Sequence, residues 1–350
     1  MRHGCLLVMT PLKPARDITP GVDRFVEFVG RRDAGSQVHG QHLHRNASFQ
    51  TPRTVETVTT QSPLRAVRDA LGSSLFEMVA GPDGPAARVR IHHTPGPRWF
   101  AEDRPIRRVH ADASMFVGGL RALLLQSLHP LAMAGVAEHS NYRDDPWGRL
   151  QRTSTFLAET TFGSAVEAQR AVDRVRGIHR RVHGIAADGR PYTATDPHLL
   201  EWVHIAEADS FLRAYQLYGA TPLVQSGRDA YVADLAEIAA RLGVVDPPRS
   251  EHALTQRLNA FRPELRSTPA ARDAARFLLL TPPLSLAARA PYGVLAATAV
   301  SMLPLWARVP LLLPYFPPVE LTVVRSVGRV LVGGIRWALP APGAAVNVRR

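Results

Sequence analysis

The 350-residue chain carries 42 lysine and arginine residues against 30 aspartate and glutamate residues, a formal net charge of +12. Its 45% hydrophobic and 21% charged residues exclude a mainly disordered protein and allow a sizeable core in one or two domains. Lys13 is the only lysine, which argues against Schiff-base and P-loop chemistry, and Cys5 is the only cysteine, which excludes iron–sulfur clusters and disulfide frameworks. Arginine is spread along the chain without a basic-aromatic module, so no nucleic-acid partner is expected.

The N-terminal part differs from the rest of the chain. Residues Cys5–Met9 form an apolar run that is too short for a convincing signal peptide, and the following residues lack an apolar period. We expect residues 1–62 to be a disordered or mis-assigned tail, residues 63–340 to form one folded domain, and residues 341–350 to be a short C-terminal tail. The expected location is the cytoplasm, with membrane association left open.

Apolar residues at helical spacing dominate the region after Pro63. A short strand or extended segment is predicted at 86–93, where Val89 and Ile91 alternate with polar residues, and another at 192–195. Asp196-Pro197 indicates a helix start and Gly243 a helix end. Helices are predicted at 64–79, 149–161, 164–187, 196–218, 228–242, 251–263 and 269–280. A further helical region, 112–125, continues into a helix at 120–138 that is kinked at His129-Pro130. The predicted fold class is all-α, as one large helical domain.

The C-terminal part, residues 284–339, is very apolar. Residues 294–316 are long enough to raise the question of a membrane span, but Pro304, Pro310 and Pro314 interrupt them and Arg308 adds a charge. We therefore expect buried helices with proline breaks, or a surface that contacts a membrane peripherally.

Histidines on apolar helix faces are the main candidates for chemistry. His179 lies within the apolar stripe of the predicted helix 164–187, where an imidazole must be satisfied by a hydrogen bond or bind something. His129 precedes a proline, and His183 follows His179 by about one turn. Each of these histidines, like His139 and His204, is by itself more often a satisfied core or surface residue than a ligand. The single E-x-x-H pair, Glu201–His204, is too little for a di-iron bundle.

Arg149 and Thr153 lie one turn apart on the predicted helix 149–161 and share a face with Phe156. The arginine is either a surface cation or a buried one directed at a propionate or an oxygen species. Its position beside an apolar stripe favours the second interpretation.

Longer motifs resemble a known family. The chain resembles the catalytic domain shared by rubber oxygenases (latex-clearing proteins) and the ER-bound oxygenase MpaB, over about residues 64–340. The matching strings are His129-Pro130-x-Ala132-x-Ala134-Gly135-Val136-x-x-His139-Ser140, Asp145-Pro146-x-Gly148-Arg149-Leu150-x-Arg152-Thr153-x-x-Phe156, Phe162-Gly163, His179-x-x-Val182-x-Gly184 and Tyr192-x-Ala194-x-Asp196-Pro197-x-Leu199-Leu200-x-Trp202-Val203-His204.

The resemblance implies a mainly helical domain with a globin-like core around a b-type haem. His179 matches the histidine that holds the iron, and Arg149 and Thr153 match functional residues on the distal side. Rubber oxygenases have a lysine directly before that threonine, whereas this chain has Arg152, which has no lone pair for iron. The sixth iron position is then open, bound to water, or filled by His139 or His129. Glu138 is a candidate for the distal acid by proximity only.

The function predicted from the resemblance is a haem b-dependent oxygenase acting with O₂ on an apolar substrate, such as a lipid, an isoprenoid or a polyketide-like chain. Two alternatives stay open: a haem-binding protein without turnover, and a peripheral membrane or partner-binding helical protein that uses residues 284–339. The expected catalytic residues are Arg149, Thr153 and His139. The expected cofactor contacts are His179 as metal ligand, with His183, Arg152 and His129.

Overall fold

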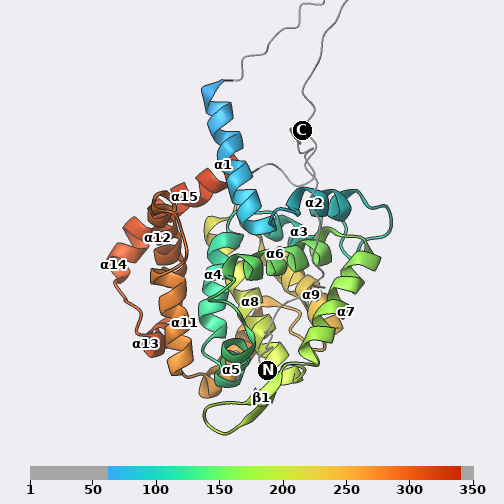
Figure 1. Cartoon of the computed structure of the whole chain (residues 1–350), viewed down its shortest axis with the longest axis vertical. Helices are drawn as coiled ribbons and strands as arrows, with labels where there is room; N and C mark the ends of the chain where they lie inside the picture. Colours follow the sequence, from blue (N-terminus) through green and yellow to red (C-terminus); the bar gives the residue numbers. More distant parts are fainter. Residues whose placement is uncertain (1–61, 340–350) are drawn as a thin grey trace, which may run out of the picture. The chain divides into compact units, whose positions relative to one another are not determined.

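The computed structural model describes residues 62–339, and the predicted tails lie outside this range. The described part is mainly helical, as predicted (Figure 1). Its elements are α1 (Pro63–Ala80), α2 (Gly84–His93), α3 (Pro105–His110), α4 (Met115–Gln126), α5 (Pro130–His139), α6 (Pro146–Phe162), α7 (Ala165–His179), β1 (His183–Ile185), β2 (Pro191–Thr193), α8 (Pro197–Tyr218), α9 (Gln225–Leu242), α10 (Glu251–Phe261), η1 (Arg262–Glu264), α11 (Pro269–Leu280), α12 (Leu286–Ser301), α13 (Leu305–Leu311), α14 (Pro317–Val319), η2 (Glu320–Val324) and α15 (Arg325–Ala338).

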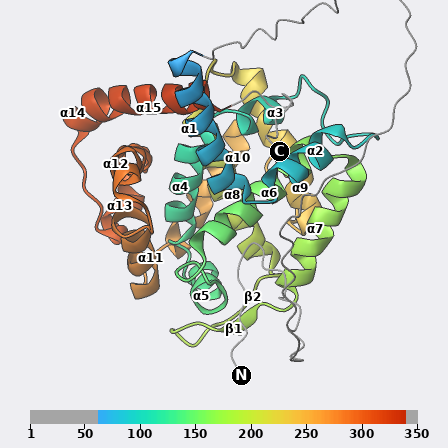
Figure 2. The ribbon, with the colours of Figure 1, turned by 45° about the horizontal axis from the view of Figure 1, so that its top comes forward.

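Helices α4 and α8 form the centre of this domain. Helices α11 to α15 lie on one side of them and α7 lies on the other, in both views (Figures 1 and 2). At Gly118 on α4, a Cβ atom would lie 2.8 Å from the Phe211 ring and 3.2 Å from the Ala214 side chain. Glycine at this position therefore allows the backbones of α4 and α8 to approach closely.

A buried ion pair joins the same two helices. The guanidinium of Arg121 on α4, 2% exposed, donates to Oδ2 of Asp209 on α8 at 2.7 Å. It also donates to the Ser210 hydroxyl at 2.6 Å and to the carbonyl of Met302, just after α12, at 3.1 Å. One cation thus connects three separate elements, and its charge is neutralised inside the core.

The predicted kink at His129-Pro130 is a complete break in the chain direction. Helix α4 ends at Gln126, and α5 begins at Pro130 after a bend of 106°. His129 has extended backbone angles, which the following proline favours, and its Nδ1 accepts a long hydrogen bond of 3.4 Å from the Ala132 amide. The imidazole therefore acts as the N-cap of α5.

The strand predicted at 86–93 is wrong, because these residues form helix α2. Val89 is 57% exposed whereas Ile91 is 4% exposed, which fits two positions about 200° apart around a helix and not one face of a strand. Pro85 starts the helix, and Arg98 donates to the carbonyls of Ile91 and His92 at its end, at 3.0 and 2.9 Å. The tertiary contact with Arg98 completes a helix end whose sequence pattern alone is ambiguous.

The helix predicted at 164–187 is also too long. Helix α7 ends at His179, and residues 183–193 form an antiparallel hairpin in which Gly184 pairs with Tyr192. The turn uses Gly189 at a φ of 83°, which favours glycine. Val182 is buried in the core, but it is not on a continuous helical face with His179. His183 consequently does not share the face of His179.

The apolar C-terminal part consists of short helices with breaks, as expected from its prolines. Arg308 organises the break after α13: its guanidinium is 2% exposed and donates to the carbonyls of Ser301, Leu303 and Pro314 and to Glu320, at 2.7 to 3.1 Å. Within residues 62–339 no single helix is long and apolar enough to cross a membrane, although the bent pair α4 and α5 passes that test by length and composition.

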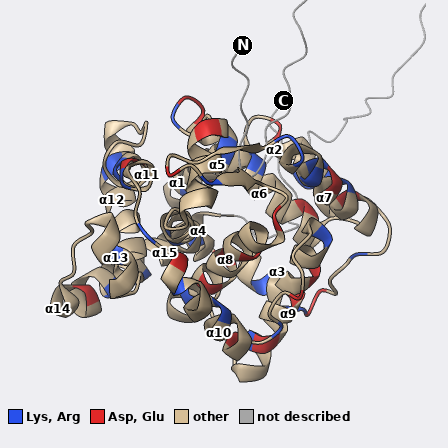
Figure 3. Ribbon diagram, turned by 90° about the horizontal axis from the view of Figure 1, so that it is seen from below, with Lys and Arg blue, Asp and Glu red and all other residues tan. Residues whose placement is uncertain are grey.

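Charged residues of both signs are interspersed over the described helices (Figure 3). Several arginines are paired with carboxylates, including Arg90 with Glu159 at 2.7 Å and Arg336 with Asp112 at 2.8 Å. This arrangement agrees with the sequence-based view that the positive charge is distributed along the chain.

Candidate functional site

His179, the last residue of α7, is a buried imidazole without a hydrogen-bond partner. Its exposed fraction is 4%, and neither Nδ1 nor Nε2 has a partner among the described residues. Burial lowers the pKa of His179 to about 4, so the ring is neutral at pH 7 and one nitrogen carries a free lone pair. Buried polar atoms without partners are uncommon, and this one points to a ligand outside the polypeptide.

Helix α8 contributes a second pair of desolvated groups, His204 and Glu207, one turn apart. Burial lowers the pKa of His204 to about 4 and raises that of Glu207 to about 7. Nε2 of His204 has no partner, and no hydrogen bond of the Glu207 carboxyl occurs within the described residues. Both residues nevertheless keep part of their surface accessible. Nε2 of His204 and the Glu207 carboxyl are thus desolvated without a hydrogen-bond partner among the described residues, so both are available to a bound group.

A hydrogen-bonded chain near Glu207 joins α9, α3 and α6. The ring of His110 lies 2.8 Å from Oγ1 of Thr161 through Nδ1 and 3.3 Å from the Tyr231 hydroxyl through Nε2. Burial raises the pKa of Tyr231, and the nearby Glu207 carboxylate raises it further. Tyr231 therefore keeps its proton and can donate a hydrogen bond.

Arg149 is a desolvated cation without a carboxylate partner among the described residues. It donates to the Ser140 hydroxyl at 2.7 Å, and burial lowers its pKa to about 10, so it remains charged at pH 7. The Thr153 hydroxyl donates to the carbonyl of Arg149 at 3.0 Å and keeps its oxygen lone pairs. A partly accessible guanidinium with no counter-ion favours an anionic ligand, because a buried charge is costly until it is paired.

The remaining predicted distal residues are engaged in other contacts. Nε2 of His139 lies 3.2 Å from the carbonyl of His183 and 3.0 Å from the hydroxyl of Tyr192, which also donates to Glu138. These contacts fasten α5 to the β-hairpin, and the His183 side chain itself is exposed.

Arg152, which stands where rubber oxygenases have lysine, donates to Asp145 at 3.0 Å. Its Nε is buried and has no hydrogen-bond partner among the described residues. This arginine is therefore fixed at the start of α6 by an ion pair within its own helix end.

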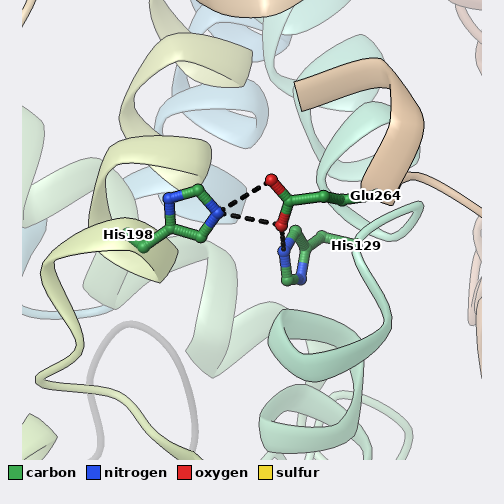
Figure 4. Close-up of side chains that lie close together, drawn as sticks. All are labelled: His129, His198 and Glu264. Atoms are coloured by element: carbon green, nitrogen blue, oxygen red, sulfur yellow. Dashed lines mark hydrogen bonds and ion pairs between the residues drawn. The ribbon is translucent and has the colours of Figure 1, made fainter. Parts of the chain in front are cut away.

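His129 belongs to a different cluster. Its Nε2 lies 3.5 Å from Oε2 of Glu264, which in turn lies 2.9 Å from Nε2 of His198 (Figure 4). Burial lowers the pKa of His129, and the Glu264 carboxylate counteracts that shift. His129 and His198 come from the starts of α5 and α8, and Glu264 is the last residue of η1.

Two surface pockets are also present, and the first adjoins the His129 cluster through Leu128 and Leu265. One, of about 340 Å³, is lined by residues such as Leu128, Leu265 and Trp306, and the other, of about 570 Å³, by residues such as His92 and Phe162. Neither includes His179, Arg149 or His204 among its lining residues.

Sequence reasoning missed Glu207, Tyr231 and His110. The signal for Glu207 was present, because this acid occupies a position at which the period of α8 calls for an apolar residue. The partners of His110 could not be predicted from its neighbours in the sequence, because Thr161 and Tyr231 come from α6 and α9.

Comparison with known proteins gives one finding. The profile of a family described as "ER-bound oxygenase mpaB/B'/Rubber oxygenase, catalytic domain" matches residues 107–337, which contain His179, Arg149, Thr153 and the α8 groups. Neither the curated proteins nor the solved structures give a match. The globin-like arrangement of the core therefore stays a prediction.

Proposed function

The chain belongs to the family of mpaB and rubber oxygenase catalytic domains, and on that premise we propose that it is a haem b-dependent oxygenase acting on an apolar substrate with O₂. The observation that carries the proposal is His179, a neutral and buried imidazole with two unpartnered nitrogens inside the matched region. An axial histidine is the commonest way to hold a haem iron when cysteine is absent from the domain.

The donor set fits this cofactor. His179 would bind the haem iron, and Arg149, which lacks a carboxylate partner among the described residues, would pair with an anionic group of the cofactor or hold a polar oxygen group. Haem iron supplies the one-electron chemistry that O₂ requires. His204 is a second candidate ligand, because its Nε2 is also buried without a partner.

The chain's own side chains would hold and release a proton. The Glu207 carboxyl, with a pKa raised to about 7, can hold a proton and release it near neutral pH. The Tyr231 hydroxyl keeps its proton because burial and the Glu207 charge raise its pKa. Tyr231, His110 and Thr161 form a hydrogen-bonded chain in the core, and no hydrogen bond among the described residues joins Glu207 to it.

An apolar substrate is supported by the residues around these groups. Phe156 on α6, Phe211 on α8 and Val175 on α7 are buried in the same apolar cluster, and Met115 and Leu157 pack against it. A binding space among such apolar side chains would favour a lipid, isoprenoid or polyketide-like chain over a charged metabolite. Arg152 in place of lysine excludes an iron-capped resting state through that position, so the substrate need not be polyisoprene.

The test is the absorption spectrum of the full chain produced with haem, beside three single variants. We expect a Soret band in the parent, and its loss or clear shift in His179→Ala. His183→Ala is the matched control, because this exposed residue lies four positions further on and should leave the band unchanged. A band that survives in His179→Ala but changes in His204→Ala would assign the ligand to α8. No band in the parent after full reconstitution would refute the haem proposal.

A second proposal, contact with a membrane surface, is supported by the C-terminal elements. Leu312 and Phe316 are 68% and 65% exposed, and Leu321 on η2 is 54% exposed. Exposed apolar side chains near Arg325 and Arg329 suit an anionic lipid interface. Sedimentation with anionic vesicles should fall in a Leu312→Ser, Phe316→Ser double variant while the Soret band stays unchanged. Equal sedimentation of parent and variant would refute this contact.

A further inference from the structure

A second group of metal-ligating side chains, distinct from the proposed haem site, lies at the starts of α5 and α8. His129, His198 and Glu264 each offer one ligand atom, and these atoms lie within 4.8 Å of one another (Figure 4). It is the only such group of three that the described residues contain. The ligand atoms come from parts of the chain that are far apart in sequence, so tertiary packing has brought them together.

The positions of the three side chains are fixed by contacts that do not involve their ligand atoms. The amide of Arg266, two residues after Glu264, donates to the carbonyl of Leu128, next to His129, at 2.9 Å. The indole of Trp202 on α8 donates to the carbonyl of Gln126 at 3.1 Å. The two backbone segments and α8 are therefore held together whether or not a ligand is present.

Aromatic rings hold the two imidazoles. The His198 ring stacks on Phe261 with centroids 4.4 Å apart, and the His129 ring packs against Phe261 and Trp202 at 6.3 and 6.2 Å. Packing that fixes the ring orientation lowers the entropy lost when a ligand binds.

The distances fit a first-row metal ion. Two ligands at tetrahedral metal–ligand distances are separated by about 3.3 Å. Nε2 of His129 lies 3.5 Å from Oε2 of Glu264, too far for a good hydrogen bond, and Nε2 of His198 lies 2.9 Å from the same oxygen. Small side-chain adjustments would place all three atoms around one ion.

Two observations point to a missing ligand. The His129 side chain is 2% exposed, and its Nε2 has no hydrogen-bond partner although it faces the Glu264 carboxylate. His198 and Glu264 are 49% and 45% exposed, so an ion can enter and keep water at its remaining positions. Binding through Nε2 would move the imidazole proton to Nδ1 and end the long contact from the Ala132 amide, a weak bond at 3.4 Å.

We propose that His129, His198 and Glu264 bind a divalent first-row transition-metal ion, with zinc as the probe. Two imidazoles and one carboxylate are a known ligand set for such ions. The ion joins the first turns of α5 and α8 to η1 and stabilises this end of the domain. The haem proposal does not use these three residues as its ligand, because it rests on His179 with His204 as the second candidate.

The test is titration of Zn²⁺ into the tag-free, chelator-treated full chain by calorimetry, with Co²⁺ absorption as a second readout. We expect one tight Zn²⁺ in the parent and an affinity weakened at least about tenfold in both Glu264→Gln and His198→Gln. His252→Gln is the matched control, because His252 is an exposed histidine on α10 whose ring forms a hydrogen bond with Gln256. Its affinity should stay within about twofold of the parent. Both ligand variants alter half-exposed side chains, so they test binding without emptying the core.

Zinc bound equally well by the parent and both ligand variants would overturn the proposal. So would a parent that binds neither Zn²⁺ nor Co²⁺ in the micromolar range, which would identify the group as a hydrogen-bonded histidine–carboxylate cluster. The measurement is made on haem-free and haem-treated protein. Zinc binding without a Soret band would refute the haem proposal alone, and a Soret band without zinc binding would refute this one alone.

Discussion

Removing the carboxylate of Asp209 should destabilise the domain far more than removing a carboxylate at the surface. Asp209 is 2% exposed and neutralises Arg121, which is itself 2% exposed. In Asp209→Ala the guanidinium keeps two neutral acceptors, the Ser210 hydroxyl and the Met302 carbonyl, but loses its counter-ion. Leaving a buried charge uncompensated costs about 3–5 kcal/mol.

The assay is urea unfolding followed by circular dichroism at pH 7, with Glu237→Ala as the control. Glu237 pairs with Arg249, but their side chains are 47% and 59% exposed, so its loss should cost at most about 1 kcal/mol. Replacing both partners, as Arg121→Met with Asp209→Leu, should recover much of the loss, because no buried charge then remains. Equal free energies of unfolding for Asp209→Ala and Glu237→Ala would refute the reasoning.

Four further substitutions test other parts of the structure. Gly184→Ala should lower the free energy of unfolding by about 1–3 kcal/mol, because its Cβ would lie 2.6 Å from the Tyr192 hydroxyl. Gly293→Ala should instead raise this free energy by about 0.5–1 kcal/mol, because Gly293 lies in a helix with no atom within 4 Å of the new Cβ. The opposite order of the two variants in thermal melts would refute this reasoning. Because burial raises the folded-state pKa of Glu207 from 4.5 to about 7, its contribution to stability is present below pH 4.5 and is lost as pH rises through about 7. Glu207→Gln should therefore gain stability over the parent between pH 5 and pH 8, by up to about 3 kcal/mol, in urea titrations at the two pH values; a pH-independent difference would contradict the raised pKa. Arg98→Ala should cost about 1.5–3 kcal/mol in the same assay, since it removes the charged donor at the end of α2, and a loss no larger than that of Glu237→Ala would show that this cap is dispensable.

Local sequence signals were sufficient for most helix positions and for one part of the candidate site. Asp196 and Pro197 start α8, Gly243 follows the end of α9, and α11 spans the predicted residues. His179 could be selected because a polar residue in an apolar stripe is visible in the periodicity alone. These features depend on neighbours within a few residues, which the sequence displays directly.

Tertiary structure decided the features that depend on distant residues. Arg98, which bonds the end of α2, also donates to the carbonyl of Phe162 on α6, and the end of α7 coincides with a hairpin whose glycine admits the contact between Tyr192 and Glu138. The resemblance implied His129 as a haem contact, which stays a prediction, and only the packing of α8 and η1 places His198 and Glu264 against this histidine. The spacing of apolar residues in the sequence cannot show that these three residues come together. The side chains of residues 129, 198 and 264 meet only after the helices have packed and backbone hydrogen bonds have fixed the distances between the helices.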